Sequence, residues 1–101
     1  MRVLISANGP TWDAIVAPAF DTAPYWLLVD SDTNTLEALS GDNRPALSSL
    51  AVAAVITGHV HADTATQAVH ANIPVYTIPA GGIRIAYDQW KRGRIKLIIA
   101  E

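Results

Sequence analysis

The chain has 101 residues, of which 50% are hydrophobic and 16% are charged, with a formal net charge of −2 and no cysteine. This length fits one domain over residues 1–101, and this much apolar material excludes a disordered chain. The lack of cysteine excludes disulfides and thiolate ligands, and a pI near 5.8 lacks the basic footprint expected for nucleic-acid binding.

No targeting or membrane segment stands out. The chain begins directly with strand-like residues, and no apolar stretch approaches the ~20 residues that a membrane-spanning helix needs. We therefore expect a cytoplasmic protein with neither a membrane nor a nucleic acid as partner. A domain of this size buries only about two-thirds of its unfolded surface, which is compatible with a homodimer.

The first part of the chain predicts three strands. Val3–Ala7 is an apolar run typical of a buried strand, and Asn8–Pro18 follows it as a long loop. Tyr25–Asp30 and Thr35–Leu39 predict an antiparallel hairpin, with the turn residues Asp32–Asn34 at its tip.

The rest of the chain alternates helices with strands. We expect, in order, a helix from Pro45 to about Val52, a strand over Ala53–Thr57, a helix capped by Asp63 or Thr64 and reaching about Asn72, a strand over Pro74–Ile78, a helix from Ile83 to about Arg92, and a last strand or extended tail over Ile95–Ile99. Such alternation implies right-handed crossovers and parallel neighbours. The prediction is an α/β fold with a mixed five-stranded sheet (β-β-β-α-β-α-β-α) and helices on its faces.

Ligands of open α/β sheets bind beyond the carboxyl ends of the parallel strands. Three predicted loops meet at that edge, namely Asn8–Pro18, Gly58–Asp63 and Pro79–Gly82. The last two each open a helix, and helix N-termini favour an anion or an anionic cluster. We expect a cofactor-binding cleft there, lined by Ser6, Asn8, Trp12, Asp13, Gly58, Gly81 and Gly82.

His59 and His61 lie in the second of these loops and are the candidate metal ligands. Residues two apart in an extended segment project to the same side, so both imidazoles could reach one ion. A tetrahedral zinc site needs a third ligand, which Asp13, Asp63 or an external group could supply. Imidazole also suits copper, iron and nickel. The alternative is that both histidines are loop residues hydrogen-bonded to backbone.

Several candidates have plain structural explanations. Trp12 could cover a ligand or pack on the sheet edge. Gly81-Gly82 could cradle a phosphate or form an ordinary turn, since it lacks the spaced glycines and lysine of a P-loop. Ser6 lacks the G-x-S-x-G setting of a nucleophile, and no catalytic constellation stands out, so we do not expect an enzyme.

Two stretches carry a resemblance to a known family. The first runs Asp13-x-x-Val16-x-x-x-Phe20-Asp21-Thr22-Ala23-x-Tyr25 and continues to Val29-Asp30. The second comprises Ile56-Thr57-Gly58, Ala65 and Ala71-Asn72-Ile73-Pro74-Val75-Tyr76. Both resemble conserved blocks of the dinitrogenase iron–molybdenum cofactor biosynthesis family, and together they cover almost the whole chain.

The resemblance implies a ribonuclease H-like fold. It also implies a non-enzymatic role, in which the protein binds, stores or delivers an iron–sulfur or iron–molybdenum cluster during nitrogenase cofactor assembly, with cluster donor or acceptor proteins as partners. The fold does not imply nuclease activity. Arg2–Ala7 also lacks the carboxylate that active nucleases of this fold carry in the first strand.

The chain departs from the family at two places. Asp21-Thr22 stands where the family has Gly-Arg, which removes a cation, and His59 and His61 stand where the family has glycines. Because the chain has no cysteine, a cluster would be held by histidine, by backbone amides or by a partner's ligands. The leading hypothesis is a metal- or cluster-binding carrier. The alternative is a protein–protein interaction or regulatory domain that keeps the fold without binding a cluster.

Overall fold

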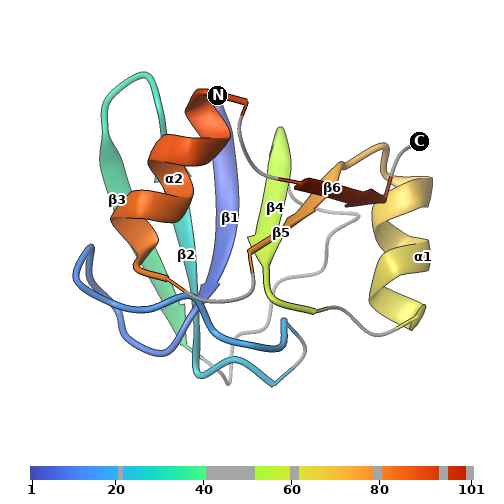
Figure 1. The fold of residues 1–101 in the computed structure, drawn as a ribbon, viewed down its shortest axis with the longest axis horizontal. Helices are drawn as coiled ribbons and strands as arrows, with labels where there is room; N and C mark the ends of the chain where they lie inside the picture. Colours follow the sequence, from blue (N-terminus) through green and yellow to red (C-terminus); the bar gives the residue numbers. More distant parts are fainter. Residues whose placement is uncertain (21, 41–51, 60–61, 79–80, 94–95, 100–101) are drawn as a thin grey trace.

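The strands form one mixed sheet. The computed structural model describes residues 1–20, 22–40, 52–59, 62–78, 81–93 and 96–99. Its elements are β1 (Arg2–Ala7), β2 (Tyr25–Asp30), β3 (Thr35–Ser40), β4 (Ala54–Thr57), α1 (Ala62–His70), β5 (Val75–Thr77), α2 (Ile83–Lys91) and β6 (Lys96–Ile99). The strand order is β3-β2-β1-β4-β5-β6 (Figure 1). The five predicted strands are all present, and β6 extends the sheet to six at one edge, in a segment that the sequence left open as strand or tail.

The strand directions agree with the prediction. β1 runs parallel to β4, and β4 runs parallel to β5. β2 and β3 form an antiparallel hairpin that pairs with β1 through β2. Asn34 lies in the hairpin turn with a φ of 54°, in the left-handed region that asparagine tolerates. The helix predicted from Pro45 to about Val52 falls outside the described residues, except for its last position, Val52.

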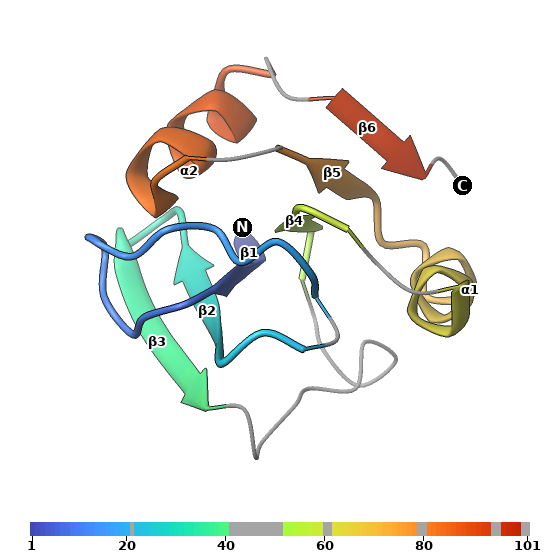
Figure 2. The same ribbon diagram turned by 60° about the horizontal axis from the view of Figure 1, so that its bottom comes forward.

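Alternation along the strands produces two hydrophobic cores, one on each face of the sheet. Val3 and Ile5 of β1 belong to the core that contains α2, whereas Leu4 belongs to the core that contains Ala68 of α1. Figure 2 shows α2 and α1 on opposite sides of the sheet. The predicted layering, with helices on both faces, is confirmed.

The C-terminus of α1 is closed by a Schellman motif. Asn72 has a φ of 57°, and its N–H donates to the Val69 carbonyl at 3.1 Å. The N–H of Ile73 donates to the Ala68 carbonyl at 2.9 Å, and these two side chains belong to the same core. This is the hydrogen-bond pair and the apolar contact of that motif, so the stop predicted at Asn72 is confirmed.

Both helices begin close to the predicted residues. α1 starts at Ala62, one or two residues before the predicted cap at Asp63 or Thr64, and α2 starts at Ile83 as predicted. Within the described part of the chain, no helix is long and apolar enough to cross a membrane.

Candidate functional site

Ser6 and Thr57 form a buried hydroxyl pair at the carboxyl ends of β1 and β4. Both residues are fully buried, and the Ser6 Oγ donates to the Thr57 Oγ1 at 2.7 Å. The Ser6 Oγ also lies 3.3 Å from the Ala17 carbonyl oxygen, and the Thr57 Oγ1 lies 3.4 Å from the His59 carbonyl oxygen. Buried hydroxyls need such partners. Ser6 and Thr57 together connect β1 and β4 to the loops that follow these strands.

The loop after β1 crosses the carboxyl ends of the parallel strands and joins the other two loops. The N–H of Val16 donates to the Gly81 carbonyl at 2.9 Å, and the N–H of Phe20 donates to the His59 carbonyl at 2.8 Å. Asn8 closes the base of the same loop, because its Oδ1 accepts the Ile15 N–H at 3.2 Å. The three loops therefore meet as expected, and their main chains are hydrogen-bonded to one another.

Of the three glycines predicted to line a cleft, Gly58 and Gly81 also have structural reasons to be glycine. A Cβ on Gly58 would lie 2.5 Å from the Pro18 carbonyl oxygen, so a side chain there would push two loops apart. Gly81 has a φ of 140°, which residues with a Cβ rarely adopt. Gly82 is the N-cap of α2 without a side-chain cap, and the first helical N–H donates to the Ala14 carbonyl at 2.9 Å.

The candidate metal ligands are only partly placed. His59 is exposed at the junction of the loops, whereas His61 lies outside the described residues. Of the proposed third ligands, Asp13 pairs with Arg84 at 3.6 Å, and Asp63 is exposed in the first turn of α1. The described residues contain no group of three His, Asp or Glu side chains that could hold an ion. A closed all-protein metal centre is therefore not formed by this part of the chain.

Trp12 packs on α2. Its ring lies 5.5 Å from the Tyr87 ring, at an interplanar angle of 55°, and the Arg84 guanidinium lies 5.7 Å from its centroid. Together with the ion pair between Arg84 and Asp13, these contacts hold the tip of the loop on the helix. The predicted site residues thus fall into two places, with Ser6 and Gly58 at the strand ends, and Trp12 and Asp13 beside α2.

Four residues on one side of α2 lie beside Trp12 and do not belong to the predicted site. They are Arg84, Tyr87, Asp88 and Lys91, which line a surface hollow together with Trp12 and Asn34. Their spacing of i, i+3, i+4 and i+7 is a sequence signal for one helix face. That pattern alone predicts packing, and only the position of Trp12 shows that the charged members surround a hollow.

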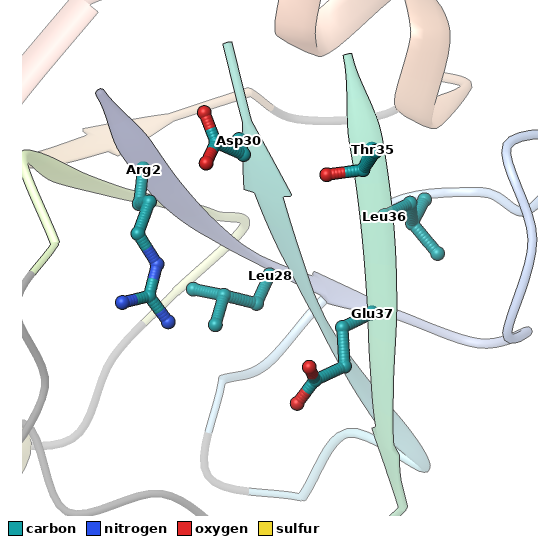
Figure 3. A pocket seen from close by; sticks show the side chains of 6 residues that line it. All are labelled: Arg2, Leu28, Asp30, Thr35, Leu36 and Glu37. Carbon is teal, nitrogen blue, oxygen red and sulfur yellow. The ribbon is translucent and has the colours of Figure 1, made fainter. Parts of the chain in front are cut away.

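A further hollow, of about 270 Å³, lies beside the amino end of β1 on the first three strands. Figure 3 shows Arg2, Leu28 and Glu37 around it, with Asp30 and Thr35 at its upper end. Arg2 is paired in register with Asp30, and Leu28 with Glu37. Polar side chains are expected on the solvent-facing side of antiparallel strands, so this lining has a structural explanation.

Solved structures with this fold cover nearly the whole chain. The apo form of the orange protein from Desulfovibrio gigas has a TM-score of 0.82 and 22% identity over 98% of this chain and 93% of that chain. A candidate NifB protein from Thermotoga, of the DUF35 family, has a TM-score of 0.83 and 22% identity over 96% and 92%. A candidate dinitrogenase from Methanocaldococcus jannaschii has a TM-score of 0.82 and 17% identity over 100% and 97%. No protein-family model and no curated protein matches the sequence.

These structures confirm the predicted fold class, a ribonuclease H-like α/β fold. The names of two of these structures refer to NifB and to dinitrogenase. These names agree with the family that the two sequence blocks resemble. At identities of 17–22%, the likeness concerns the fold.

Proposed function

We propose that the protein is a small non-enzymatic carrier of a metal ion or of an iron–sulfur or iron–molybdenum cluster, related to nitrogenase cofactor assembly. Cluster donor or acceptor proteins are its proposed partners. The main support is the agreement of the fold, over nearly the full length, with the candidate NifB and dinitrogenase proteins. In this role the cluster is cargo that passes to another protein.

The chemistry of the loop junction fits a ligand held by few protein atoms. His59 is exposed there, and α1 begins three residues later at Ala62. The first N–H groups of a helix lack helical acceptors, and its positive dipole end favours negative charge. His59 and the N-terminus of α1 suit an anionic cluster better than an ion that needs four protein ligands. The remaining coordination of such a cluster comes from its own sulfides or from a partner's ligands.

Anaerobic reconstitution tests the proposal. The protein is incubated with ferrous iron and sulfide, or with thiomolybdate, then desalted and analysed by absorbance and metal content. We expect stoichiometric uptake by the wild type and loss of most of it in the His59→Ala/His61→Ala double variant. His70→Ala is the matched control, because His70 is an exposed imidazole in the last turn of α1, and this variant should bind like the wild type.

Two outcomes would count against the proposal. Equal uptake by the double variant and the wild type would remove the histidines from the site. A wild type that takes up no stoichiometric metal under any of these conditions would remove the carrier role itself.

One observation favours a second candidate, a protein–protein interaction or regulatory domain that binds no cluster. Ile15 and Ile85 are 52% and 57% exposed, and both lie where the loop after β1 meets α2. Large apolar side chains left exposed at such a junction are candidates for an interaction surface. This candidate predicts no stoichiometric metal and no effect of either histidine substitution, so the same reconstitution separates the two.

A further inference from the structure

The hollow beside α2 has the dimensions of a small-molecule site. Its volume is about 300 Å³, at the lower end of the range of roughly 300–1,000 Å³ for ligand pockets. Its lining residues come from the loop after β1, from the β2–β3 turn and from one side of α2, and they are Trp12, Asn34, Arg84, Tyr87, Asp88 and Lys91. A ligand of one or two rings would match this space.

One wall of the hollow is aromatic. The rings of Trp12 and Tyr87 are tilted, with their centroids 5.5 Å apart. Behind them, the rings of Tyr87 and Trp90 are stacked at 6.1 Å, with an interplanar angle of 26°. Aromatic rings attract further rings in tilted or offset arrangements. A flat aromatic ligand would therefore continue a series of ring contacts that the protein has already formed.

Two cations stand at the ends of this wall. The Arg84 guanidinium lies 5.7 Å from the centroid of Trp12, and the Lys91 ammonium lies 5.2 Å from the centroid of Tyr87. They are seven residues apart on α2, which separates their backbones by roughly 10 Å along the helix. A carboxylate beside the ring of a ligand can pair with either cation.

The carboxylates nearby do not neutralise both cations. Asp88 is paired with Arg92 at 3.1 Å. Arg84 meets Asp13 only at 3.6 Å, and their side chains are 65% and 86% exposed, so water screens this pair strongly. Among the described residues, no carboxylate lies within ion-pair distance of Lys91. Lys91, and to a lesser degree Arg84, is therefore available to pair with an anion.

The Tyr87 hydroxyl is buried on the side of Ser31. Tyr87 is only 7% exposed, and its hydroxyl oxygen has no hydrogen-bond partner among the described residues. Burial, followed by the charges of Asp30 and Asp32, raises the pKa of this phenol, while the Ser31 hydroxyl opposes the shift without reaching hydrogen-bond geometry. The phenol thus stays neutral at neutral pH. Because its hydroxyl is buried beside Ser31, Tyr87 offers its ring, and not its hydroxyl, to a ligand in the hollow.

We propose that this hollow binds a small planar aromatic anion of one or two rings, of which an aromatic carboxylate is the simplest form. The ring would contact Trp12 and Tyr87, and the carboxylate would pair with Arg84 or Lys91. The inference does not depend on the cluster proposal, because Trp12 is the only residue that the two sites share.

The test uses three probes of similar size on the full chain, with binding followed by ¹H–¹⁵N NMR. 2-Naphthoate carries ring and charge, decahydro-2-naphthoate carries the charge without an aromatic ring, and 2-naphthalenemethanol carries the aromatic ring without the charge. We expect 2-naphthoate to shift the Trp12 indole signal and the amide signals of residues 84–91. The other two probes should each bind about threefold to tenfold more weakly.

Charge-matched variants test the residues. Arg84→Gln and Lys91→Gln should each weaken 2-naphthoate binding about threefold to tenfold. Arg2→Gln is the control, because it removes the same charge from the hollow on β1, and it should bind like the wild type. All three side chains are exposed, so circular dichroism should show unchanged folding. No shift at α2, equal binding of all three probes, or an equal loss in Arg2→Gln would each overturn the proposal.

Discussion

Gly58 is a residue at which two loops of the proposed carrier site approach each other closely. Its substitution by alanine places a Cβ 2.5 Å from the Pro18 carbonyl oxygen and 3.0 Å from the Pro18 Cα. Because these are backbone atoms, they cannot move aside like a flexible side chain. We expect Gly58→Ala to lower the free energy of unfolding by about 3 kcal/mol, at the upper end of overpacking costs, as measured by urea titration.

Gly82→Ala is the matched control for this substitution. Gly82 has a φ of −75°, and its Cβ would meet nothing closer than the Ala14 carbonyl oxygen at 3.9 Å. A loss within about 1 kcal/mol is expected there, from the weaker N-cap. If both glycine variants were equally stable, the contact between Gly58 and Pro18 would not constrain the loops in solution.

Single residues also show where sequence reasoning stops. Glycine at position 58 and serine at position 6 were predictable as residues near the strand ends, but their close contacts with Pro18 and Thr57 join segments about 40 to 50 positions apart. For Trp12 the sequence allows either a cover over a ligand or packing on the sheet edge, and the structure places its ring against Tyr87 of α2. Local patterns cannot rank such alternatives, because the deciding neighbours are distant in sequence.

Elements whose ends depend on local signals were predicted well. Asn72 closes α1 with a φ of 57° and the two hydrogen bonds of a Schellman motif. We expect Asn72→Gly to stabilise the protein slightly and Asn72→Ala to destabilise it by about 1 kcal/mol, because a Cβ without a local hydrogen-bonding group disfavours the left-handed conformation. The difference in thermal midpoint between the two variants measures this effect.

Gln67→Ala and Gln67→Gly provide the comparison on the same helix. Gln67 is exposed in the interior of α1, so glycine there should be less stable than alanine by about 1 kcal/mol. The order of the two substitutions should therefore be reversed between positions 67 and 72. The same order at both positions would contradict the left-handed cap.

The elements that the sequence placed less well lack such signals. The sequence allows either a strand or an extended tail at β6, because its pairing with β5 is a long-range contact at a sheet edge. The path of the loop after β1 was open for a similar reason, since it is fixed by main-chain bonds to Gly81 and His59. Main-chain hydrogen bonds between loops carry no side-chain pattern, which explains why the loops were expected to meet but their contacts were not foreseen.

At the scale of the whole molecule, the two cores share their strands. β1 contributes Leu4 to the core on the α1 side and Ile5 to the core on the α2 side, and both residues are fully buried. Neither core can lose its packing without disturbing strands that support the other. A domain built in this way should unfold in one cooperative transition.

The three tryptophans allow a direct test of this coupling. Trp26 is buried in the α1-side core, whereas Trp12 and Trp90 pack against the α2-side core. With 5-fluorotryptophan incorporated, we expect all three ¹⁹F signals to report the same urea midpoint. Leu4→Ala should lower the free energy of unfolding by about 3 kcal/mol at all three probes, and Ile5→Ala should do the same from the opposite face. If Leu4→Ala moved only the Trp26 transition, the two faces would unfold separately, and the shared strands would not couple the α2 hollow to the rest of the fold.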